Sequence, residues 1–390
     1  MILEQLTLRH FRNYRETTVT FAPAGGYITG ANGSGKTNLL EAIYFLANQT
    51  SFRTTSREDL QGWHATRCMV GAVVHNREHH QQSELAIHLA QGNRHLWLNG
   101  KETRDSRRFS AHFAAVAFHP GTLNVIKGSP AGRRYLIDRG IASLSPTFVQ
   151  ASQDFQRALK QRNALLRSPT DAAMATIWTE RFIDAALHLM RARQEHITLL
   201  NDILATLVHT LRVDVDAVRL EYRPAVLARY VLPEREALLN GGASDARLRE
   251  HCFAEAHRLQ RAEEAMGQTL FGPQRDDVAI CYRGRESRSY ASQGQQRLVA
   301  FLLVAALATA IHRQCGHRPV VLLDDVVSEL DERNRQVIFH FLQTQAFQVF
   351  VTDVEERGLP CSPHAFTRLH VRQVHGYAAL GRDAVLPQPA

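Results

Sequence analysis

The sequence predicts an α/β fold in which the two halves of one domain are separated by a helical insert. A glycine-rich loop at 30–37 lies between a strand-like segment and an amphipathic helix. Far along the chain, the apolar run 320–323 ends in two adjacent aspartates. Between them, residues 171–212 contain neither glycine nor proline, which favours a long helix. These observations divide the chain into 1–145, an insert at 146–265, and 266–390.

The first half, 1–145, is predicted to contain several strands and one early helix. Apolar side chains alternate near the N-terminus on both sides of a turn at Asn13-Tyr14. The helical pattern runs from Lys36 to Ala47, and Asn99-Gly100 is a strong hairpin-turn signal. The predicted strand segments are 6–8, 19–21, 26–30, 85–89, 96–98 and 115–118.

The insert, 146–265, is predicted to be helical throughout. Ser145 followed by Pro146 is typical of a helix start, with a capping residue and then proline in the first turn. An apolar stripe follows along 183–203, and an unbroken helix over 171–212 would be roughly 60 Å long. A loop at Gly241-Gly242 precedes another predicted helix. The pattern fits a simple bundle cap and a DNA-reaching arm equally well.

The second half, 266–390, returns to alternating strands and helices. Val278, Ile280 and Tyr282 indicate a strand, and the apolar run 298–311 indicates a buried helix. Strands are predicted at 319–323 and 347–351, with an amphipathic helix between them. We expect the last 30 residues to be irregular.

Composition indicates a globular, basic protein. The chain has 390 residues, 44% of them hydrophobic, and 46 Lys+Arg oppose 38 Asp+Glu, a formal charge of +8. This balance favours nucleic acid or an anionic membrane as a partner, although arginine-rich genome composition produces the same excess. Only four lysines occur, and one of them, Lys36, lies in the glycine-rich loop.

Compartment signals favour the cytoplasm. The five cysteines are scattered and form no CxxC pair, so neither a disulfide framework nor a zinc site is expected. Arg9, Arg12 and Arg15 occupy the N-terminal region where a secretory segment would be apolar. The apolar run 298–311 is too short to span a bilayer, so no membrane association is expected.

The glycine-rich loop carries the strongest chemical signal. It matches the pattern G-x-x-x-x-G-K-[ST], in which backbone N–H groups converge on phosphate oxygens at a helix N-terminus. Lys36 supplies a compact charge to the β- and γ-phosphates, and Thr37 offers a hydroxyl to Mg²⁺. The predicted ATP-binding residues are Gly30, Ala31, Asn32, Gly33, Ser34, Gly35, Lys36 and Thr37.

The apolar strand 320–323 delivers Asp324 and Asp325 to the edge of the sheet where nucleotides bind in open α/β folds. We expect Asp324 to hold Mg²⁺ through water, and Asp325 to orient or deprotonate the attacking water. Lys36 and Asp325 are thus the predicted catalytic residues.

A third segment, Ser292 to Arg297, immediately precedes the apolar helix. A serine and a glycine at a helix N-terminus can bind a γ-phosphate through backbone N–H groups and a hydroxyl. Ser292, Gly294 and Gln295 are therefore predicted to contact nucleotide. The segment is followed by the acidic strand and then by Ser328-Glu329-Leu330-Asp331, an order more specific than any one motif.

Taken together, seven segments resemble the RecF family of bacterial recombination mediators, whose ABC-type P-loop ATPase head is related to SMC heads. They are LRHFRNYR (8–15), GANGSGKTNLLEAIYFL (30–46), SFRT (51–54), KGSPAGRRYLID (127–138), GPQRDD (272–277), SQGQQR (292–297) and LLDDVVSELDERNR (322–335). The resemblance implies an ATP-dependent dimer that binds DNA and assists RecO and RecR in loading recombinase at gaps, and a part in the SOS response. Ser292 of one protomer would complete the site of the other, and Arg12 would reach the phosphates.

The sequence departs from the family pattern at three places: Gln274 replaces a histidine, Gly121-Thr122 replace Glu-Asp, and Asp353 replaces a threonine. Two other functions remain open, the ATPase subunit of a membrane transporter and a structural SMC-like tether. The signature lacks the transporter pattern LSGGQ, and the insert is too short for SMC arms.

Three further groups of residues have ambiguous patterns. The histidines at 75, 79 and 80 have metal-like spacing but no matching partners, so solvent exposure is favoured. Two arginine groups fit either phosphate contacts or an ordinary solvated face. These groups are Arg104, Arg107 and Arg108, and Arg133, Arg134 and Arg139.

Overall fold

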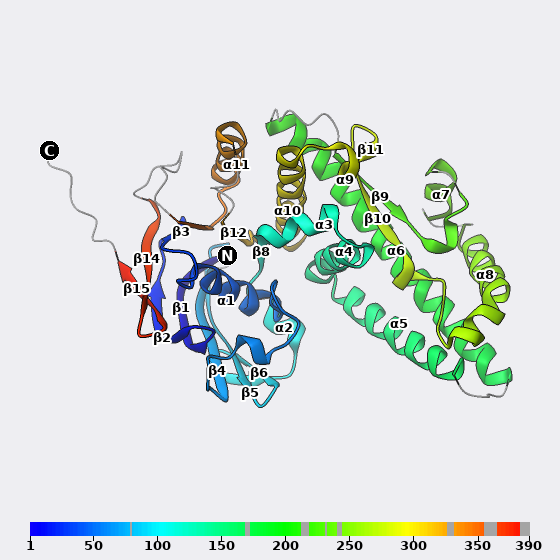
Figure 1. Ribbon diagram of the computed structural model, residues 1–390, viewed down its shortest axis with the longest axis horizontal. Coiled ribbons are helices and arrows are strands. Elements are labelled where there is room, and N and C mark those ends of the chain that lie inside the picture. Colours follow the sequence, from blue (N-terminus) through cyan, green and yellow to red (C-terminus); the bar gives the residue numbers. More distant parts are fainter. Residues whose placement is uncertain are drawn as a thin grey trace. The chain divides into compact units, whose positions relative to one another are not determined.

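The computed structural model describes residues 1–78, 80–167, 172–211, 218–230, 232–239, 244–325, 331–354 and 365–382. The chain forms two compact units (Figure 1). The first unit comprises Met1–Leu123, Leu211–Val213 and Gln293–Ala390, and the second comprises Asn124–Thr210 and Asp214–Ser292.

One sheet of the first unit is largely parallel. Its six strands have the order β15-β14-β3-β13-β12-β8, and only the β14–β15 pair is antiparallel. The apolar runs of β12 and β13 are buried along their whole length, as strands with both faces covered must be. Their bounds are β3 Gly25–Thr29, β8 Ala115–Phe118, β12 Val320–Leu323, β13 Val349–Asp353, β14 Thr367–Val374 and β15 Tyr377–Arg382.

Strands β14 and β15 show that the expected irregular C-terminus is wrong in part. β14 lies beside β3 in parallel, with Leu369 opposite Ile28, and β15 returns antiparallel to it. β14 and its partner β3 come from regions far apart in the chain. Because pairing to this distant strand stabilises β14, its local sequence alone did not reveal it.

The second sheet of the first unit is antiparallel, in the order β2-β1-β4-β5-β6-β7. Its strands alternate buried and accessible side chains, as in β5, where Leu85, Ile87 and Leu89 are buried. The bounds are β1 Ile2–Phe11, β2 Tyr14–Thr20, β4 Arg67–Asn76, β5 Gln81–Ala90, β6 Asn93–Leu98 and β7 Lys101–Thr103. One hydrophobic core joins this sheet to the parallel sheet and to helix α1, Lys36–Asn48.

The helices of the first unit include α10, which is almost entirely buried from Leu298 to Ile311. It packs on β8 through Phe301, whose ring centroid lies 6.0 Å from that of Phe118. α10 is long and apolar enough to cross a membrane, but 78% of its most apolar window is buried inside the protein. The helices are α1 Lys36–Asn48, α2 Ser106–Ser110, α10 Gln293–Cys315 and α11 Glu332–Thr344. Helix α3, Leu123–Lys127, begins at Leu123, the last residue of the unit's first segment, and continues into the second unit.

The second unit is built mainly of helices, with α6 the longest, a single 40-residue helix shown in green (Figure 1). Ser145 caps α5 by accepting the N–H of Phe148, and Pro146 occupies its first turn, as predicted. The bounds are α4 Pro130–Leu144, α5 Pro146–Leu165, α6 Ala172–Leu211, α7 Leu232–Leu239, α8 Ser244–Met266 and α9 Ser287–Tyr290.

A small antiparallel sheet completes the second unit, in the order β11-β10-β9. Strand β9, Val218–Arg223, was not predicted, and it pairs along its whole length with β10, Asp277–Tyr282. β11 is Arg285–Glu286.

Buried ion pairs tie the elements of the second unit together. Arg193 on α6 bonds both carboxylate oxygens of Asp138 on α4 at 2.8 Å. Arg133 on α4 likewise donates to both carboxylate oxygens of Asp277 on β10, at 2.8 and 3.0 Å. This unit therefore includes α4 and the sheet, and extends beyond the predicted insert 146–265 at both ends.

Candidate active site

The glycine-rich loop connects the end of β3 to the start of α1, and its glycines adopt conformations that other residues disfavour. Gly30 and Gly35 have φ values of 148° and 121°. A Cβ on Gly30 would lie 2.3 Å from the carbonyl oxygen of Val371, so a side chain is excluded there. A Cβ on Gly33 would meet nothing within 4 Å, which leaves open space beside the loop.

Lys36 is buried within the loop, with 4% of its surface exposed. Its Nζ donates to the carbonyl oxygens of Gly30 at 2.8 Å and Ala31 at 3.2 Å. Among the described residues, no carboxylate lies within ion-pair distance of this ammonium group. Buried charges are normally paired, so a buried cation with only carbonyl partners fits an anionic ligand such as phosphate.

Three side chains outside the motif brace the loop, and their roles were not predicted from the sequence. Asn13 donates to the carbonyl oxygen of Ser34 at 3.0 Å, and the Tyr14 hydroxyl donates to that of Gly35 at 3.1 Å. Gln373 on β14 donates to the carbonyl oxygen of Gly33 at 3.1 Å. Their N–H and O–H groups bind the carbonyls of Ser34, Gly35 and Gly33, so these side chains hold the loop through its acceptors and not through its N–H groups.

Ser34 is also part of the fit to phosphate. Its hydroxyl is buried and has no hydrogen-bond partner among the described residues. A buried hydroxyl without a partner costs free energy, which a phosphate oxygen would recover. Asn32 and Ala31 complete the loop, and Asn32 is exposed.

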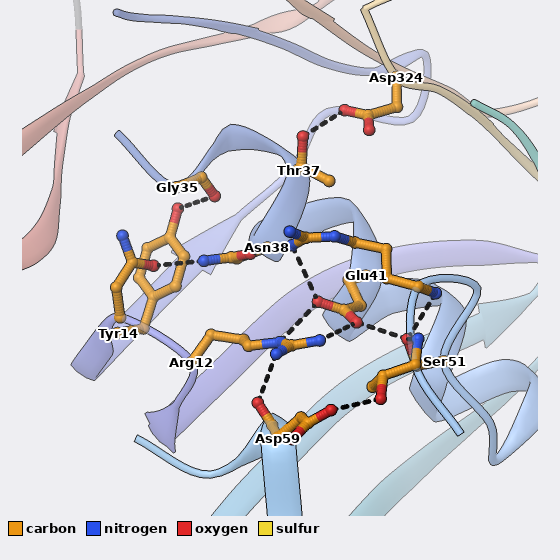
Figure 2. Close-up of polar contacts among 12 residues, drawn as sticks. Arg12, Tyr14, Gly35, Thr37, Asn38, Glu41, Ser51, Asp59 and Asp324 are labelled. Atoms are coloured by element: carbon orange, nitrogen blue, oxygen red, sulfur yellow. Dashed lines mark hydrogen bonds and ion pairs between the residues drawn. The ribbon is translucent and has the colours of Figure 1, made fainter. Parts of the chain in front are cut away.

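The parallel sheet brings Asp324 to the start of α1. The Thr37 hydroxyl donates to Oδ1 of Asp324 at 2.9 Å (Figure 2). Burial raises the pKa of Asp324, although hydrogen bonds from Thr352 and Thr37 act in the opposite direction. A hydroxyl and a carboxylate are the oxygen ligands that Mg²⁺ prefers, so this pair fits the predicted metal role.

Thr352, near the end of β13, is a site residue that sequence reasoning missed. Its hydroxyl donates to Oδ1 of Asp324 at 2.8 Å and accepts the backbone N–H of Asp325 at 2.9 Å. It therefore orients both aspartates. Asp325 follows with a φ of 51°, a left-handed conformation that turns the chain sharply after β12.

A buried carboxylate on α1, Glu41, organises a second polar cluster beside the loop (Figure 2). Arg12 donates hydrogen bonds to both carboxylate oxygens of Glu41, at 2.9 and 2.7 Å, and the Ser51 hydroxyl donates to one of them. Arg53 lies 3.5 Å from the same carboxylate and also donates to Asn38 at 2.7 Å. Arg12 is thus held by Glu41, and its predicted contact with phosphate stays a prediction.

The predicted signature residues lie at the start of α10. Ser292 is exposed and is the last residue of the second unit. Gly294 and Gln295 lie in the first turn of α10, in the first unit, and a Cβ on Gly294 would meet open space. Residues 328–330 of the following motif lie outside the described residues. Asp331 caps α11 by accepting the N–H of Asn334 at 2.7 Å.

The departures from the family pattern have local structural roles. Thr122 accepts the backbone N–H of His119 at 3.0 Å, and Nδ1 of His119 accepts that of Gly121 at 3.1 Å. Gln274 donates to the carbonyl oxygen of Phe271 at 2.6 Å. Asp353 accepts the Tyr27 hydroxyl at 3.3 Å.

Among the described residues, no group of three or more potential metal ligands occurs, and the expectation for the histidines at 75, 79 and 80 stays a prediction. His75 lies 3.7 Å from Glu4. His79 is outside the described residues.

Comparison with known proteins shows which family the chain belongs to. The model of the RecF/RecN/SMC N-terminal domain matches residues 2–373. The DNA replication and repair protein RecF of Halalkalibacterium halodurans is 32% identical over 365 residues, 92% of this chain and 94% of that protein. The RecF protein of Symbiobacterium thermophilum is 33% identical over 360 residues, 91% and 92% of the two chains.

Solved structures agree on the fold. The recombination mediator protein RecF–ATP in the RecFOR pathway covers 97% of both chains with a TM-score of 0.83 at 22% identity. An Smc head bound to the C-winged helix domain of ScpA gives a TM-score of 0.55 at 16% identity, covering 99% of this chain and 98% of that one. The predicted ABC-type α/β head is confirmed, and no match supports a transporter. The chain belongs to the RecF/RecN/SMC N-terminal domain family and, within it, to the RecF family of DNA replication and repair proteins.

Proposed function

We propose that this protein is an ATP-dependent DNA-binding switch of recombinational gap repair, with slow, DNA-dependent ATP hydrolysis. The observation that carries the proposal is the meeting of Thr37 and Asp324, 2.9 Å apart, beside a loop whose buried Lys36 faces no carboxylate among the described residues. Triphosphate and Mg²⁺ need this combination of one cation, loop N–H groups and oxygen ligands.

Each residue of the site has a distinct proposed task. Lys36 neutralises charge on the β- and γ-phosphates, and Thr37 and Asp324 would hold Mg²⁺, which would supply further positive charge to the bound triphosphate. Asp325 orients or deprotonates the attacking water. Thr352 keeps the two aspartates in place, because its hydroxyl bonds one side chain and the backbone of the other.

The nucleotide is proposed to join two protomers. Ser292, Gly294 and Gln295 would complete the partner's site at the γ-phosphate, which explains why ATP rather than ADP should hold the dimer together. The exposure of Ser292 and the open space beside Gly294 support this role, since both positions are accessible to a second protomer.

The proposed partners follow from the family. A solved RecF structure is described as part of the RecFOR pathway, so we propose RecO and RecR as partners in loading recombinase at gapped DNA. We also propose a part in the SOS response and a cytoplasmic location. The basic charge of +8 supports DNA as the ligand, because the phosphate backbone is strongly negative.

The experiment that tests the function is an ATPase measurement with and without gapped DNA, at fixed Mg²⁺. We expect a slow basal rate that rises with gapped DNA. Equal rates in both conditions, together with no retention on DNA in the presence of ATP, would contradict the proposal. Flotation with lipid vesicles serves as the control for a membrane-coupled ATPase.

A further inference from the structure

The two ambiguous arginine groups of the sequence differ sharply in the structure. In the second unit, Arg133 is buried against Asp277 and Arg134 donates to the carbonyl oxygen of Asp276. In the first unit, Arg104, Arg107 and Arg108 are exposed. None of these three has a carboxylate within ion-pair distance among the described residues. Arg133 and Arg134 are thus engaged inside the fold, whereas Arg104, Arg107 and Arg108 are available to a ligand.

Two further arginines extend the exposed group. Arg94 on β6, which is half-buried, donates to Ser106, the first residue of α2, at 3.5 Å. The exposed Arg57 donates at 3.5 Å to the carbonyl oxygen of Gly92, two residues before Arg94. Like the others, neither is ion-paired within the described part of the chain. We call these five residues the arginine surface: Arg57, Arg94, Arg104, Arg107 and Arg108.

Two of the like charges of this surface, those of Arg57 and Arg94, are close enough to interact. Partial burial lowers the pKa of Arg94, and the nearby charge of Arg57 lowers it further. Such repulsion within one protein is unfavourable, and an anion bound between the guanidinium groups would relieve it.

Two carboxylates of the same region, Asp105 and Glu58, lie near these arginines and offset part of their charge, but neither forms an ion pair with them within the described part of the chain. Asp105 caps α2, accepting the backbone N–H groups of Arg107 and Arg108 at 3.0 Å each. Glu58 accepts the Ser56 hydroxyl at 2.6 Å. Asp105 is thus hydrogen-bonded to the backbone N–H groups of Arg107 and Arg108 and not to their guanidinium groups, and both arginines stay exposed.

The base of the surface is fixed to the helix that carries the phosphate loop. Gln49, buried at the C-terminal end of α1, donates to the Ser106 carbonyl at 3.0 Å and to the Ser110 hydroxyl at 2.8 Å. Arg94 donates to the Gln49 carbonyl at 3.3 Å. The arginines therefore sit on a preorganised platform, which lowers the entropic cost of binding an extended ligand.

We propose that the arginine surface binds the phosphate backbone of DNA. Guanidinium groups suit phosphate because they donate in a bidentate fork and are weakly hydrated. Several arginines without carboxylate partners on one rigid platform suit a ligand with regularly repeated phosphates better than an acidic peptide. The proposal rests on the proposed DNA-binding function and assigns it a site on the first unit.

The test compares two triple variants that remove the same charge. One is Arg104→Ala/Arg107→Ala/Arg108→Ala. Its control replaces three exposed arginines that are ion-paired at 3.2, 3.0 and 2.6 Å, Arg157→Ala/Arg249→Ala/Arg258→Ala. Binding to gapped DNA is measured with ATP and Mg²⁺ over a range of salt concentrations. For every phosphate that is no longer neutralised, the log–log salt slope on duplex DNA should fall by about 0.9.

We expect the first variant to bind at least tenfold more weakly, with a slope reduced by about 2.7 on duplex DNA if all three arginines contact phosphate, and the control to match wild type. ATP affinity and thermal melting should be unchanged in both, and if the triple variant melts early, Arg107→Ala alone should still lower the slope by about 0.9. If wild type binds DNA and the two variants bind as well as wild type, or are weakened equally, the assignment of DNA binding to the arginine surface is wrong. The proposed function is not contradicted by that result. Wild-type protein that binds no DNA overturns the proposed function as well.

Discussion

Thr37 and Asp324 are hydrogen-bonded at 2.9 Å although 287 residues separate them in the chain. Parallel pairing of β3, β13 and β12 creates this contact, because it places the carboxyl ends of the strands at one edge of the sheet. The phosphate loop follows β3 and the aspartates follow β12. The second unit therefore interrupts the domain in sequence without separating the two parts of its site.

Nucleotide binding should depend on Lys36. Replacing it in Lys36→Met removes the buried cation that the loop N–H groups cannot replace. ATP affinity should fall at least a hundredfold in a titration with fluorescent nucleotide. The melting temperature of the nucleotide-free protein should stay within a few degrees of wild type. A folded variant with undiminished ATP affinity would refute the site.

Asp325→Asn should separate binding from hydrolysis. Asp325 serves the attacking water, whereas Lys36 and Thr37 serve the bound triphosphate. The variant should bind ATP and retain DNA binding, while its turnover in a coupled ATPase assay should fall at least tenfold. Loss of DNA binding as complete as in Lys36→Met would contradict the switch.

Ser292→Arg should block dimerisation without blocking ATP binding. A bulky side chain would stand where the partner's γ-phosphate meets the start of α10. Sedimentation should show wild type changing from monomer to dimer with ATP and Mg²⁺, but not with ADP, and the variant should remain monomeric. Mixing it with Lys36→Met should restore partial ATPase activity. An ATP-independent oligomer without such rescue would exclude the shared site.

Glu41→Gln should lower the free energy of unfolding more than the loss of an exposed ion pair does. Glu41 is fully buried and its pair with Arg12 is mostly shielded from water, so removing its charge leaves the Arg12 guanidinium without its carboxylate partner. We expect a loss of about 3 kcal/mol in urea unfolding. Glu16→Gln, which breaks the exposed pair with Arg9, is the control and should cost under about 1 kcal/mol. Equal losses in both variants would contradict a buried role for Glu41.

His119 should make the protein acid-sensitive. Burial lowers its pKa from 6.5 to about 4. Between these values the unfolded chain binds the extra proton and the folded chain does not, so stability is full above pH 6.5 and is lost as the pH falls towards 4. Each pH unit below 6.5 lowers the free energy of unfolding by up to about 1.4 kcal/mol.

His119→Asn provides the comparison for acid sensitivity, because its side-chain oxygen can still accept the Gly121 N–H. Urea unfolding of the variant should depend less on pH between 6.5 and 4 than that of wild type. Identical pH profiles would show that another group controls acid sensitivity.

Much of the architecture was predictable because its signals are local. The glycine pattern at 30–37 encodes a loop conformation that only glycine adopts easily, as the φ of Gly30 and Gly35 shows. The apolar runs of β12 and α10 mark buried elements, and Ser145-Pro146 marks a helix start. In each case neighbouring residues carry the whole signal.

The pairing of distant segments was not predictable in this way. Strand β9 depends on β10, and β14 depends on β3, so neither was recognised from its own residues. The same limit explains why the second unit is wider than the predicted insert, since Arg133 of α4 meets Asp277 of β10 only in the folded chain.

The sequence by itself determined the fold class, the phosphate loop and the two aspartates at the end of a buried strand. Tertiary structure alone decided that Thr352 orients those aspartates, that Glu41 holds Arg12, and which arginines remain exposed. The physical reason is range: backbone conformation and periodicity act over a few residues, whereas hydrogen bonds and ion pairs join whichever residues the packed core brings within about 3 Å.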